Sequence, residues 1–453
     1  MRTRGLVRSV AVAGLFGAFL CGPAQAQTLT ADAAVKTAMD HSGLVVGARA
    51  GVMSARGSSL SAYGGILPNV SAALSRAESR TTNETGSTVF LGVPEVINPN
   101  DSRSSRTSPV VSVSWGILQP SSWANLSAAR SNSKSARFTL DATRNDVALS
   151  VRRQFYEVVK AIKLAEVSEG SLQLARDDER RVKAMFEVGS VSKSDLLKAQ
   201  VRTAQSEVSL LQARQAITVN RIELARQMGV DEAGLGNVDT LLTTEGESRT
   251  LDEAALLAEA GTRRPDLVAA EASLASARAS HGAARLGRLP YVTASGSMSF
   301  NPKSNFTNTD RTTGLEVTGD NRADKDLSAQ VALRWDIFSL STVDARIASS
   351  RAALINAQEE RDALRRNLAG EVRQAILAYR EANESRVAAQ RGVESATENL
   401  KLTQEKYNVG SATILELIDA QVQLETAKSD LVRALAAIKV AEAQINRVRG
   451  QAQ

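Results

Sequence analysis

The sequence predicts a mainly α-helical fold with a small β part, built from tandem-duplicated long α-helical hairpins and four strands. One observation is a repeat: Phe186–Gln200 (FEVGSVSKSDLLKAQ) returns 221 residues later as Tyr407–Gln421 (YNVGSATILELIDAQ). In this register about 86 residues, ending at Gly229 and Gly450, occur twice without a gap, which indicates a tandem duplication. A second observation is that aromatic residues make up only 4% of the chain, which favours long helices over a wide globular core.

Each copy of the repeated segment is predicted to form the turn of a helical hairpin. A Val-Gly pair, Val188–Gly189 or Val409–Gly410, ends one helical pattern, and a Ser or Thr precedes the next. Glycine readily adopts the left-handed conformation that ends a helix, and a hydroxyl group caps the N-terminus of the helix that follows.

Residues 1–26 are predicted to be a secretory signal peptide. They combine a basic start, an apolar run over 10–20 and the small-x-small sequence Ala24-Gln25-Ala26. A lipoprotein interpretation would make Cys21 the first mature residue, but the bulky Phe19–Leu20 before it argues against lipidation. Cleavage after Ala26 leaves a mature chain without cysteine, and therefore without disulfides.

The charge of the chain does not indicate a nucleic-acid partner. The formal net charge is +6, and Arg2, Arg4 and Arg8 of the signal peptide contribute three of these charges. The mature chain therefore carries only +3, which is too little to predict nucleic-acid binding.

The mature chain runs through one order of elements twice. Alternating apolar and small polar residues predict strands over 111–117 and 327–337, and stretches rich in Thr, Ser, Asn and Gly predict exposed loops. No proline lies between Pro120 and Pro265, as long helices require. The predicted segments are a helical segment over 27–67, a β-hairpin over 68–119 with an exposed loop over 81–107, the first long helical hairpin over 120–230, a connector over 231–263, a helix over 264–289, a second β-hairpin over 290–338 with an exposed loop over 301–326, the second long helical hairpin over 339–450 and a short tail over 451–453.

The last helical arm carries a coiled-coil seam, in which large apolar residues recur every seven positions and alanines follow three positions later. A strict seven-residue repeat imposes a left-handed supercoil. The seam consists of Leu417, Leu424, Leu431, Ile438 and Ile445 with Ala420, Ala427, Ala434, Ala441 and Val448. A plain two-helix coiled coil is the simpler interpretation, but it leaves the four strands unexplained.

The strands indicate assembly of several chains. Past the signal peptide no run reaches the roughly 18 apolar residues that a membrane helix needs, so a membrane-spanning form of this chain would be a β-barrel. Four strands cannot close a barrel alone, and open strand edges are not tolerated in lipid. Trp115 and Trp335, at matching points of the duplication, are either core residues or an aromatic belt at the membrane interface, and the nearby strand ends favour the belt.

Together these features resemble the TolC family of outer-membrane channel proteins, over essentially the whole mature chain. The residues that carry the resemblance are the duplicated Phe/Tyr-x-Val-Gly tips, the block from Arg264-Pro265-Asp266-Leu267 to Leu289-Pro290, the Trp-x-Ile-Leu/Phe strand ends at Trp115 and Trp335, and Asp419-Ala420-Gln421 within Leu417–Leu424. The resemblance implies a homotrimer in the bacterial outer membrane, with a 12-stranded barrel in the lipid, a periplasmic tunnel closed at the hairpin tips, and the connector as an equatorial segment.

The resemblance also implies a function and partners. The chain is expected to be a passive duct for drugs and small molecules, working with a periplasmic adaptor protein and an inner-membrane transporter. An alternative within this class is the outer component of type I protein secretion. A trimeric adhesion or structural stalk is the alternative from another class, but it would need a head domain that the sequence does not contain.

The resemblance locates an expected gate and docking site at the tips. Glu416 and Asp419 are spaced to share one helix face, which is either an ordinary solvated face or, in a trimer, a ring of six carboxylates at the tunnel constriction. Ser194, Asp195 and Tyr407 match positions that link hairpins in some relatives, whereas Ala412 replaces a latch arginine. The expected adaptor-docking residues are Val188, Gly189, Ser190, Val409, Gly410 and Ser411.

No catalytic or cofactor site is expected. The only histidines, His41 and His281, have no cysteine or paired carboxylates at ligand spacing, and no glycine-rich phosphate loop follows a strand. The sequence therefore predicts a protein that is not an enzyme and that carries no metal or cofactor.

Overall fold

The computed structural model describes residues 28–84, 86–90, 93–97, 99–242, 251–300, 303–322, 325–337 and 342–451. The predicted signal peptide and the last two residues of the predicted tail lie outside this part. The chain divides into two compact units. We call the first the tip unit, comprising the described residues of Met1–Ala38, Val151–Glu245 and Arg386–Ala436, and the second the sheet unit, comprising those of Met39–Ser150, Gly246–Ser385 and Ala437–Gln453.

Helices make up most of the described chain. They are α1 (Ala31–His41), α2 (Gly43–Gly64), α3 (Pro120–Glu187), α4 (Lys193–Met228), α5 (Glu253–Arg263), α6 (Pro265–Leu286), α7 (Thr342–Asn408) and α8 (Ile414–Val448), with a 3₁₀ turn η1 at Glu232–Leu235. The helical segment predicted over 27–67 is broken at Ser42, between α1 and α2. Pro120 is the first residue of α3, where a missing backbone N–H costs no hydrogen bond.

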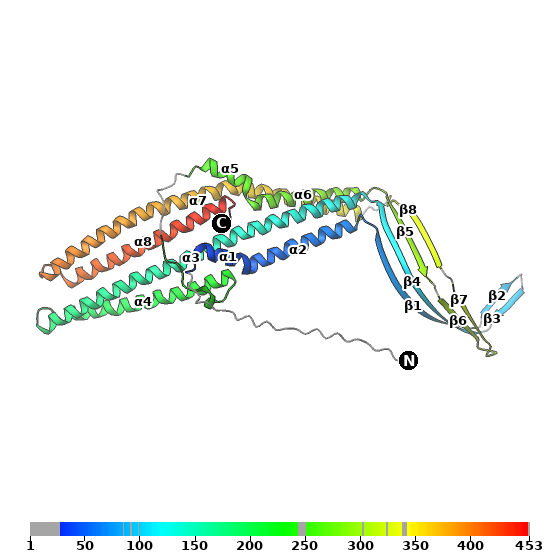
Figure 1. The fold of residues 1–453 in the computed structure, drawn as a ribbon, viewed down its shortest axis with the longest axis horizontal. Helices are drawn as coiled ribbons and strands as arrows, with labels where there is room; N and C mark the ends of the chain where they lie inside the picture. Colours follow the sequence, from blue (N-terminus) through cyan, green and yellow to red (C-terminus); the bar gives the residue numbers. More distant parts are fainter. Residues whose placement is uncertain are drawn as a thin grey trace, which may run out of the picture. The chain divides into compact units, whose positions relative to one another are not determined.

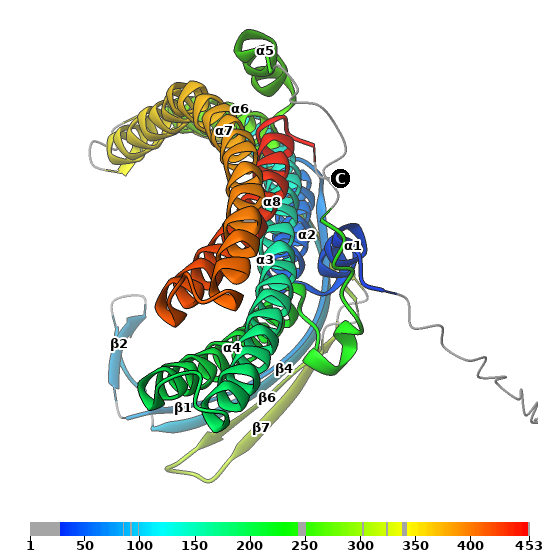
Figure 2. The same ribbon diagram turned by 90° about the vertical axis from the view of Figure 1, so that its left-hand side faces the viewer.

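The two long hairpins confirm the predicted duplication. Helices α3 and α7 have 68 and 67 residues, and the return helices α4 and α8 have 36 and 35. In both views α4 runs alongside α3, and α8 runs alongside α7 (Figures 1 and 2). The predicted seam of α8 is buried at Leu417, Leu424 and Ile438, so the seven-residue repeat does mark the packed face.

The strands belong to the sheet unit and pair antiparallel. They are β1 (Asn69–Asn83), β2 (Gly86–Phe90), β3 (Val93–Ile97), β4 (Asn100–Leu118), β5 (Tyr291–Phe300), β6 (Lys303–Asp310), β7 (Glu316–Arg322) and β8 (Lys325–Arg334). Strand β4 pairs with β1 on one side and with β5 and then β6 on the other, while β8 pairs with β5 and β7 with β6 (Figure 1). The sheet is therefore four strand positions wide, and β2–β3 is a separate hairpin.

The exposed loops predicted over 81–107 and 301–326 are largely wrong. Strand β1 continues to Asn83, β4 already begins at Asn100, and β6 and β7 occupy most of the second segment. These segments are polar because both faces of the sheet are exposed to solvent here. They still form strands, because the hydrogen bonds between strands are made by the backbone and need no apolar side chains. The final strand is shorter than predicted, because β8 ends at Arg334, before Trp335 and Ile337.

The sheet has one polar and one apolar face, as the alternation predicts. On the polar face a register row of four serines crosses the strands, namely Ser71, Ser112, Ser297 and Ser328. The neighbouring rows on the opposite face are Val70, Val113, Gly296 and Ala329, and then Ala72, Val111, Met298 and Leu327. Val70 and Leu327 are well exposed, so in a single chain nothing in the described structure covers this apolar face.

A buried arginine supports the packing of the helices in the sheet unit. Leu267, Val372 and Ile445 belong to a core cluster that joins α5, α6, α7 and α8. Arg264, immediately before α6, pairs with Asp266 and, at 2.6 Å, with Glu371 of α7. Separating α6 from α7 at this point would leave a buried charge without its partner, which is costly. The ion pair therefore favours this alignment of the two helices.

Candidate gate and docking site at the hairpin tips

Both hairpin turns end their first helix with the same backbone motif. The N–H of Gly189 donates to the carbonyl of Phe186 at 2.9 Å, and the N–H of Ser190 donates to that of Met185 at 2.8 Å. The second turn repeats these two bonds from Gly410 and Ser411, at 3.0 and 2.9 Å. The glycines have φ values of 78° and 76°, so the turn requires the left-handed conformation although a Cβ would meet no neighbouring atom.

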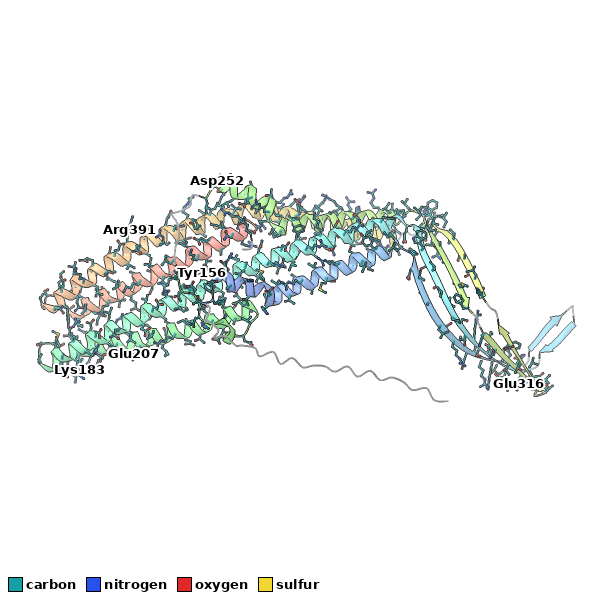
Figure 3. All side chains as sticks on the ribbon, viewed as in Figure 1. Tyr156, Lys183, Glu207, Asp252, Glu316 and Arg391 are labelled. Carbon is teal, nitrogen blue, oxygen red and sulfur yellow. The ribbon has the colours of Figure 1, made fainter. Side chains whose placement is uncertain are left out.

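The turns present apolar side chains to solvent. Val188 is 76% exposed and Val409 is 79% exposed, and Leu415 on the first turn of α8 is also exposed. The predicted docking residues therefore lie on the surface at both turns. Figure 3 marks the arms leading to the first turn with Lys183 on α3 and Glu207 on α4.

Asp195 is engaged at the start of its own helix. The hydroxyl of Ser192 accepts the N–H of Asp195 at 3.2 Å and donates to its carboxylate at 2.7 Å, and Lys198 lies 3.2 Å from the same carboxylate. The hydrogen bond from Ser192, followed by that from Lys198, lowers the pKa of Asp195. Ser194, predicted to act beside it, is exposed.

Glu416 is likewise engaged at the start of α8. Its carboxylate accepts the backbone N–H of Thr413 at 2.8 Å, while the Thr413 hydroxyl accepts the N–H of Glu416 at 3.3 Å, which forms a capping box. Asp419 accepts a hydrogen bond from Gln423 at 2.8 Å. Both residues are exposed, so Glu416 caps the helix and, together with Asp419, also places negative charge on the surface. The Thr-x-x-Glu spacing is a readable signal of the capping box.

Tyr407 lies between the two hairpins. It is only 7% exposed and belongs to a cluster with Val182 of α3, Ala199 of α4, and Ile414 and Leu417 of α8. Its hydroxyl has no hydrogen-bond partner in the described structure. Burial raises the pKa of Tyr407, and the nearby negative charges of Asp195 and then Asp178 raise it further. The structure thus brings Tyr407 near Asp195, as expected, without a bond between them. Ala412 packs against this cluster.

The sequence did not predict two polar contacts that join the hairpins. In the first, Gln421 of α8 donates to the carboxylate of Asp178 on α3, and both residues are buried. In the second, Arg202 of α4 donates to Glu425 of α8 at 2.8 Å and to Ser171 of α3 at 3.0 Å. Ser171 also donates to Glu425 at 2.7 Å. We call these two contacts the inter-hairpin links.

The inter-hairpin links are shielded from solvent. The side chain of Arg202 is 12% exposed and that of Glu425 is 23% exposed. Burial raises the pKa of Asp178, against the opposing effects of the Gln421 hydrogen bond and the charge of Arg181. A cavity of about 270 Å³ lies beside the links, with Lys163 and Glu166 of α3 and Lys428 of α8 among its lining residues.

The two predicted belt tryptophans occupy equivalent positions in the sheet unit. The indole N–H of Trp115 donates to the carbonyl of Ile66 at 3.1 Å, and that of Trp335 donates to the carbonyl of Arg288 at 3.2 Å. Both rings are exposed, so they do not belong to the core of the single chain. Trp123 near the start of α3 is also exposed, although no pattern in the sequence marks it as an interface residue.

Within the residues that the structure describes, no three His, Cys, Asp or Glu side chains are grouped so that they could hold a metal ion. None of the described helices combines the length and the apolar character that a transmembrane helix needs.

Comparison with known proteins identifies the family. The chain is 26% identical over 330 residues to outer membrane protein TolC of Vibrio cholerae serotype O1, which covers 72% of each chain. It shares its fold with the CmeC outer membrane channel of Campylobacter jejuni at 15% identity and a TM-score of 0.77, covering 93% of this chain and 85% of that one. Outer membrane protein VceC of Vibrio cholerae matches at 17% identity and a TM-score of 0.73, covering 93% and 96%.

The family model for outer membrane efflux proteins matches the chain twice, over residues 34–230 and 256–451. The two matches coincide with the two halves of the duplication, each containing a strand pair and a long hairpin. The chain therefore belongs to the outer membrane efflux protein family.

Proposed function

We propose that the protein is the outer-membrane channel of a tripartite export system and that it works as a homotrimer. The single observation that carries this proposal is the pairing, in one duplicated chain, of long helical hairpins with a sheet that has one serine-rich and one exposed apolar face. Lipid suits the apolar face, and an aqueous duct suits the polar face. The protein itself supplies a passage and no chemical step.

The sheet edges support assembly from several copies. Strand β1 pairs only with β4 among the described strands, and β8 pairs only with β5. Unpaired backbone groups at such edges are costly in hydrocarbon, so an apolar-faced sheet must close upon other sheets. Three copies, each contributing four strand positions, would make the 12-stranded barrel of the proposal.

Helix α4 offers a surface for a neighbouring copy. Six apolar side chains, each more than half exposed, recur along it at intervals that suit helix packing. They are Leu197, Val201, Val208, Leu211, Val219 and Ile222. Apolar stripes of this extent mark interaction surfaces, and in the proposed trimer they pack against helices of the next protomer.

The tips serve two roles in the proposal. The exposed turns, from Val188 to Ser190 and from Val409 to Ser411, receive the periplasmic adaptor protein, through which an inner-membrane transporter drives export. The carboxylates of Glu416 and Asp419 from three protomers form a ring that favours cations at the constriction. Ser194, Asp195 and Tyr407 contribute to closing the gate, and Trp115 and Trp335 sit at the membrane interface.

Single-channel recording tests the proposal. Purified mature protein should migrate as a trimer and open cation-preferring channels in planar phosphatidylethanolamine bilayers. Deleting its gene should sensitise cells to small toxic compounds, or stop secretion of a protein substrate if the cargo is protein. A monomer that retains its full strand content and never conducts would contradict the proposal.

A further inference from the structure

The apolar face of the sheet ends abruptly in charged residues. Along β1 the side chains on this face are Val70, Ala72 and Leu74, followed by Arg76, Glu78 and Arg80. The apolar part lies nearer the helix-connected ends of the strands, and the charged part lies toward the turns, where Figure 3 labels Glu316. Arg76 is only about 7 Å along the strand from Leu74. The change therefore occurs within one register row.

Neighbouring strands continue the same charged region. Arg103 of β4 lies directly opposite Arg80 in the register, and Lys303 of β6 lies opposite Thr107, which is in turn opposite Arg76. At the boundary itself Phe300 is paired with Lys325. These five cations, Arg76, Arg80, Arg103, Lys303 and Lys325, form what we call the basic patch.

Acidic residues neutralise part of the basic patch. Arg76 binds Glu78 at 2.7 Å, and Arg80 binds Asp101 at 2.5 Å. Asp320 and Glu316 of β7 also lie on this face by register. Arg103, Lys303 and Lys325 are exposed and form no ion pair within 4 Å with another described residue, although the hydrogen bond from Arg80 and then the charge of Arg103 lower the pKa of the neighbouring Asp101. The patch therefore keeps cationic groups available for an external anion.

The arrangement of Arg80 and Arg103 favours an anion between strands. Like charges directly opposite each other on adjacent strands are destabilising, and Asp101 is bound by Arg80. A shallow cavity of about 290 Å³ lies here, lined by Arg80, Arg103, Ser105, Asn305 and Thr307 together with Glu78. Arg80 is already held by both carboxylate oxygens of Asp101, whereas the guanidinium group of Arg103, beside hydroxyl and amide donors, matches the acceptor oxygens of a phosphate group.

We propose that the basic patch binds phosphate groups on the headgroups of an anionic glycolipid in the outer leaflet. The inference rests on the proposed function, since it requires the apolar face to lie in the membrane. Cations placed just beyond an apolar band meet lipid headgroups, and phosphate is the anion found at that level. The row of Arg76 and Lys303 and that of Arg80 and Arg103 lie about 13 Å apart along the strands, so a headgroup with two phosphates could contact both rows.

The test compares two double variants of the trimer. Arg103→Gln with Lys303→Gln removes two unpaired cations of the basic patch. Arg106→Gln with Arg334→Gln removes the same charge from the polar face, because Arg106 pairs with Ala77 and Arg334 with Tyr291 in the register. Binding of a bisphosphorylated lipid A to each trimer in detergent is measured by native mass spectrometry. Dephosphorylated lipid A and inorganic phosphate serve as competitors.

We expect the apparent Kd for bisphosphorylated lipid A to rise about thirtyfold in the basic-patch variant, and to change less than threefold in the polar-face variant. Dephosphorylated lipid A should not compete, and neither should millimolar inorganic phosphate. Equal affinity in the two double variants, or displacement by free phosphate, would overturn the inference. Conductance in phosphatidylethanolamine bilayers separates the lipid-binding inference from the proposed function. If the unmodified protein does not conduct, the proposed function is contradicted. If it conducts but the two double variants bind lipid A equally, only the lipid-binding inference is contradicted.

Discussion

Gln421 of α8 donates a hydrogen bond to the buried carboxylate of Asp178 on α3, although the two residues are 243 positions apart in the chain. This bond joins the second hairpin to the first, a few turns from the tips. The duplicated counterparts of these residues, Gln200 and Asn399, are both exposed, so one copy of the repeat carries a contact that the other lacks. The duplication thus produces two hairpins with the same backbone and different polar contacts.

Replacing Asp178 with Asn should stabilise the tip unit at neutral pH. Burial raises the pKa of Asp178, so its contribution to stability is fully present below the ordinary Asp pKa and is lost as the pH rises through the raised value. The amide oxygen of Asn still accepts from Gln421, at the cost of the pairing with Arg181 at 3.4 Å. The unfolding midpoint, followed by circular dichroism, should rise at pH 7.5 and change less at pH 4.

Asp195→Asn is the matched control, because its pKa is shifted in the opposite direction. Hydrogen bonds from Ser192 and Lys198 lower the pKa of Asp195. Its contribution is therefore present above the ordinary Asp pKa and is lost as the pH falls through the lowered value. Asp195→Asn should destabilise the protein at pH 7.5. The same sign of change in both variants at that pH would contradict the assignment for Asp178.

Arg202→Met should loosen the contact between the hairpins. The change leaves Glu425 and Ser171 without the guanidinium group, which should cost about 2 kcal/mol of local stability, since the site is mostly but not fully buried. Adding Glu425→Leu should recover part of this loss. Hydrogen exchange of backbone amides in α3 and α8 measures the local opening free energy.

Arg176→Met is the control for this prediction. It removes an exposed ion pair with Glu207 at 2.8 Å, which joins α3 to α4 within the first hairpin. Exposed pairs contribute about 0–1 kcal/mol, so amide protection should hardly change. If the two arginine variants lose protection equally, the buried link has no special role.

Replacing Gly189 or Gly410 with Val should impair export while leaving the protein in the outer membrane. Each glycine has a positive φ, and a non-glycine residue there costs about 1–2 kcal/mol and displaces the exposed valine beside it. Gly370→Val within α7 is the control, because its surroundings are also open and its φ is not positive. Export of a fluorescent small molecule from cells is the measurement. Full export by both turn variants would show that the turns do not dock a partner.

Glu416→Gln with Asp419→Asn should abolish the cation preference that we propose for the channel, without disturbing the tip. The Gln oxygen still accepts the N–H of Thr413, so the capping box is kept while the charge is removed. Reversal potentials in a salt gradient and block by a trivalent cation are the readouts. Asp430→Asn, at an exposed Asp that pairs with Arg433, is the control further along α8. Unchanged selectivity and block would return both carboxylates to an ordinary solvated face.

Local chemistry explains what the sequence could and could not predict. Gly189, Gly410 and the hydroxyl of Ser192 act within one or two helical turns, so their roles were readable from a few neighbouring residues. The strands over 81–107 were missed because a sheet solvated on both faces lacks the apolar alternation that marks a strand. The link between Arg202 and Glu425 depends on which faces of distant helices meet. The equivalent positions in the other copy of the repeat are Gln423 and Ala204, which cannot form an ion pair, so the repeat gives no sign of the link.

Crosslinking across the Gln421–Asp178 contact tests the gate most directly. The sole cysteine of the chain, Cys21, lies in the predicted signal peptide, so Asp178→Cys with Gln421→Cys introduces the only thiols of the mature protein. We expect opening of the proposed gate to separate the two hairpins at this contact, so a bis-methanethiosulfonate crosslinker should hold single-channel conductance at its resting level and stop export. A reductant that removes the crosslink should restore both. Full conductance and export with the crosslink in place would contradict the account.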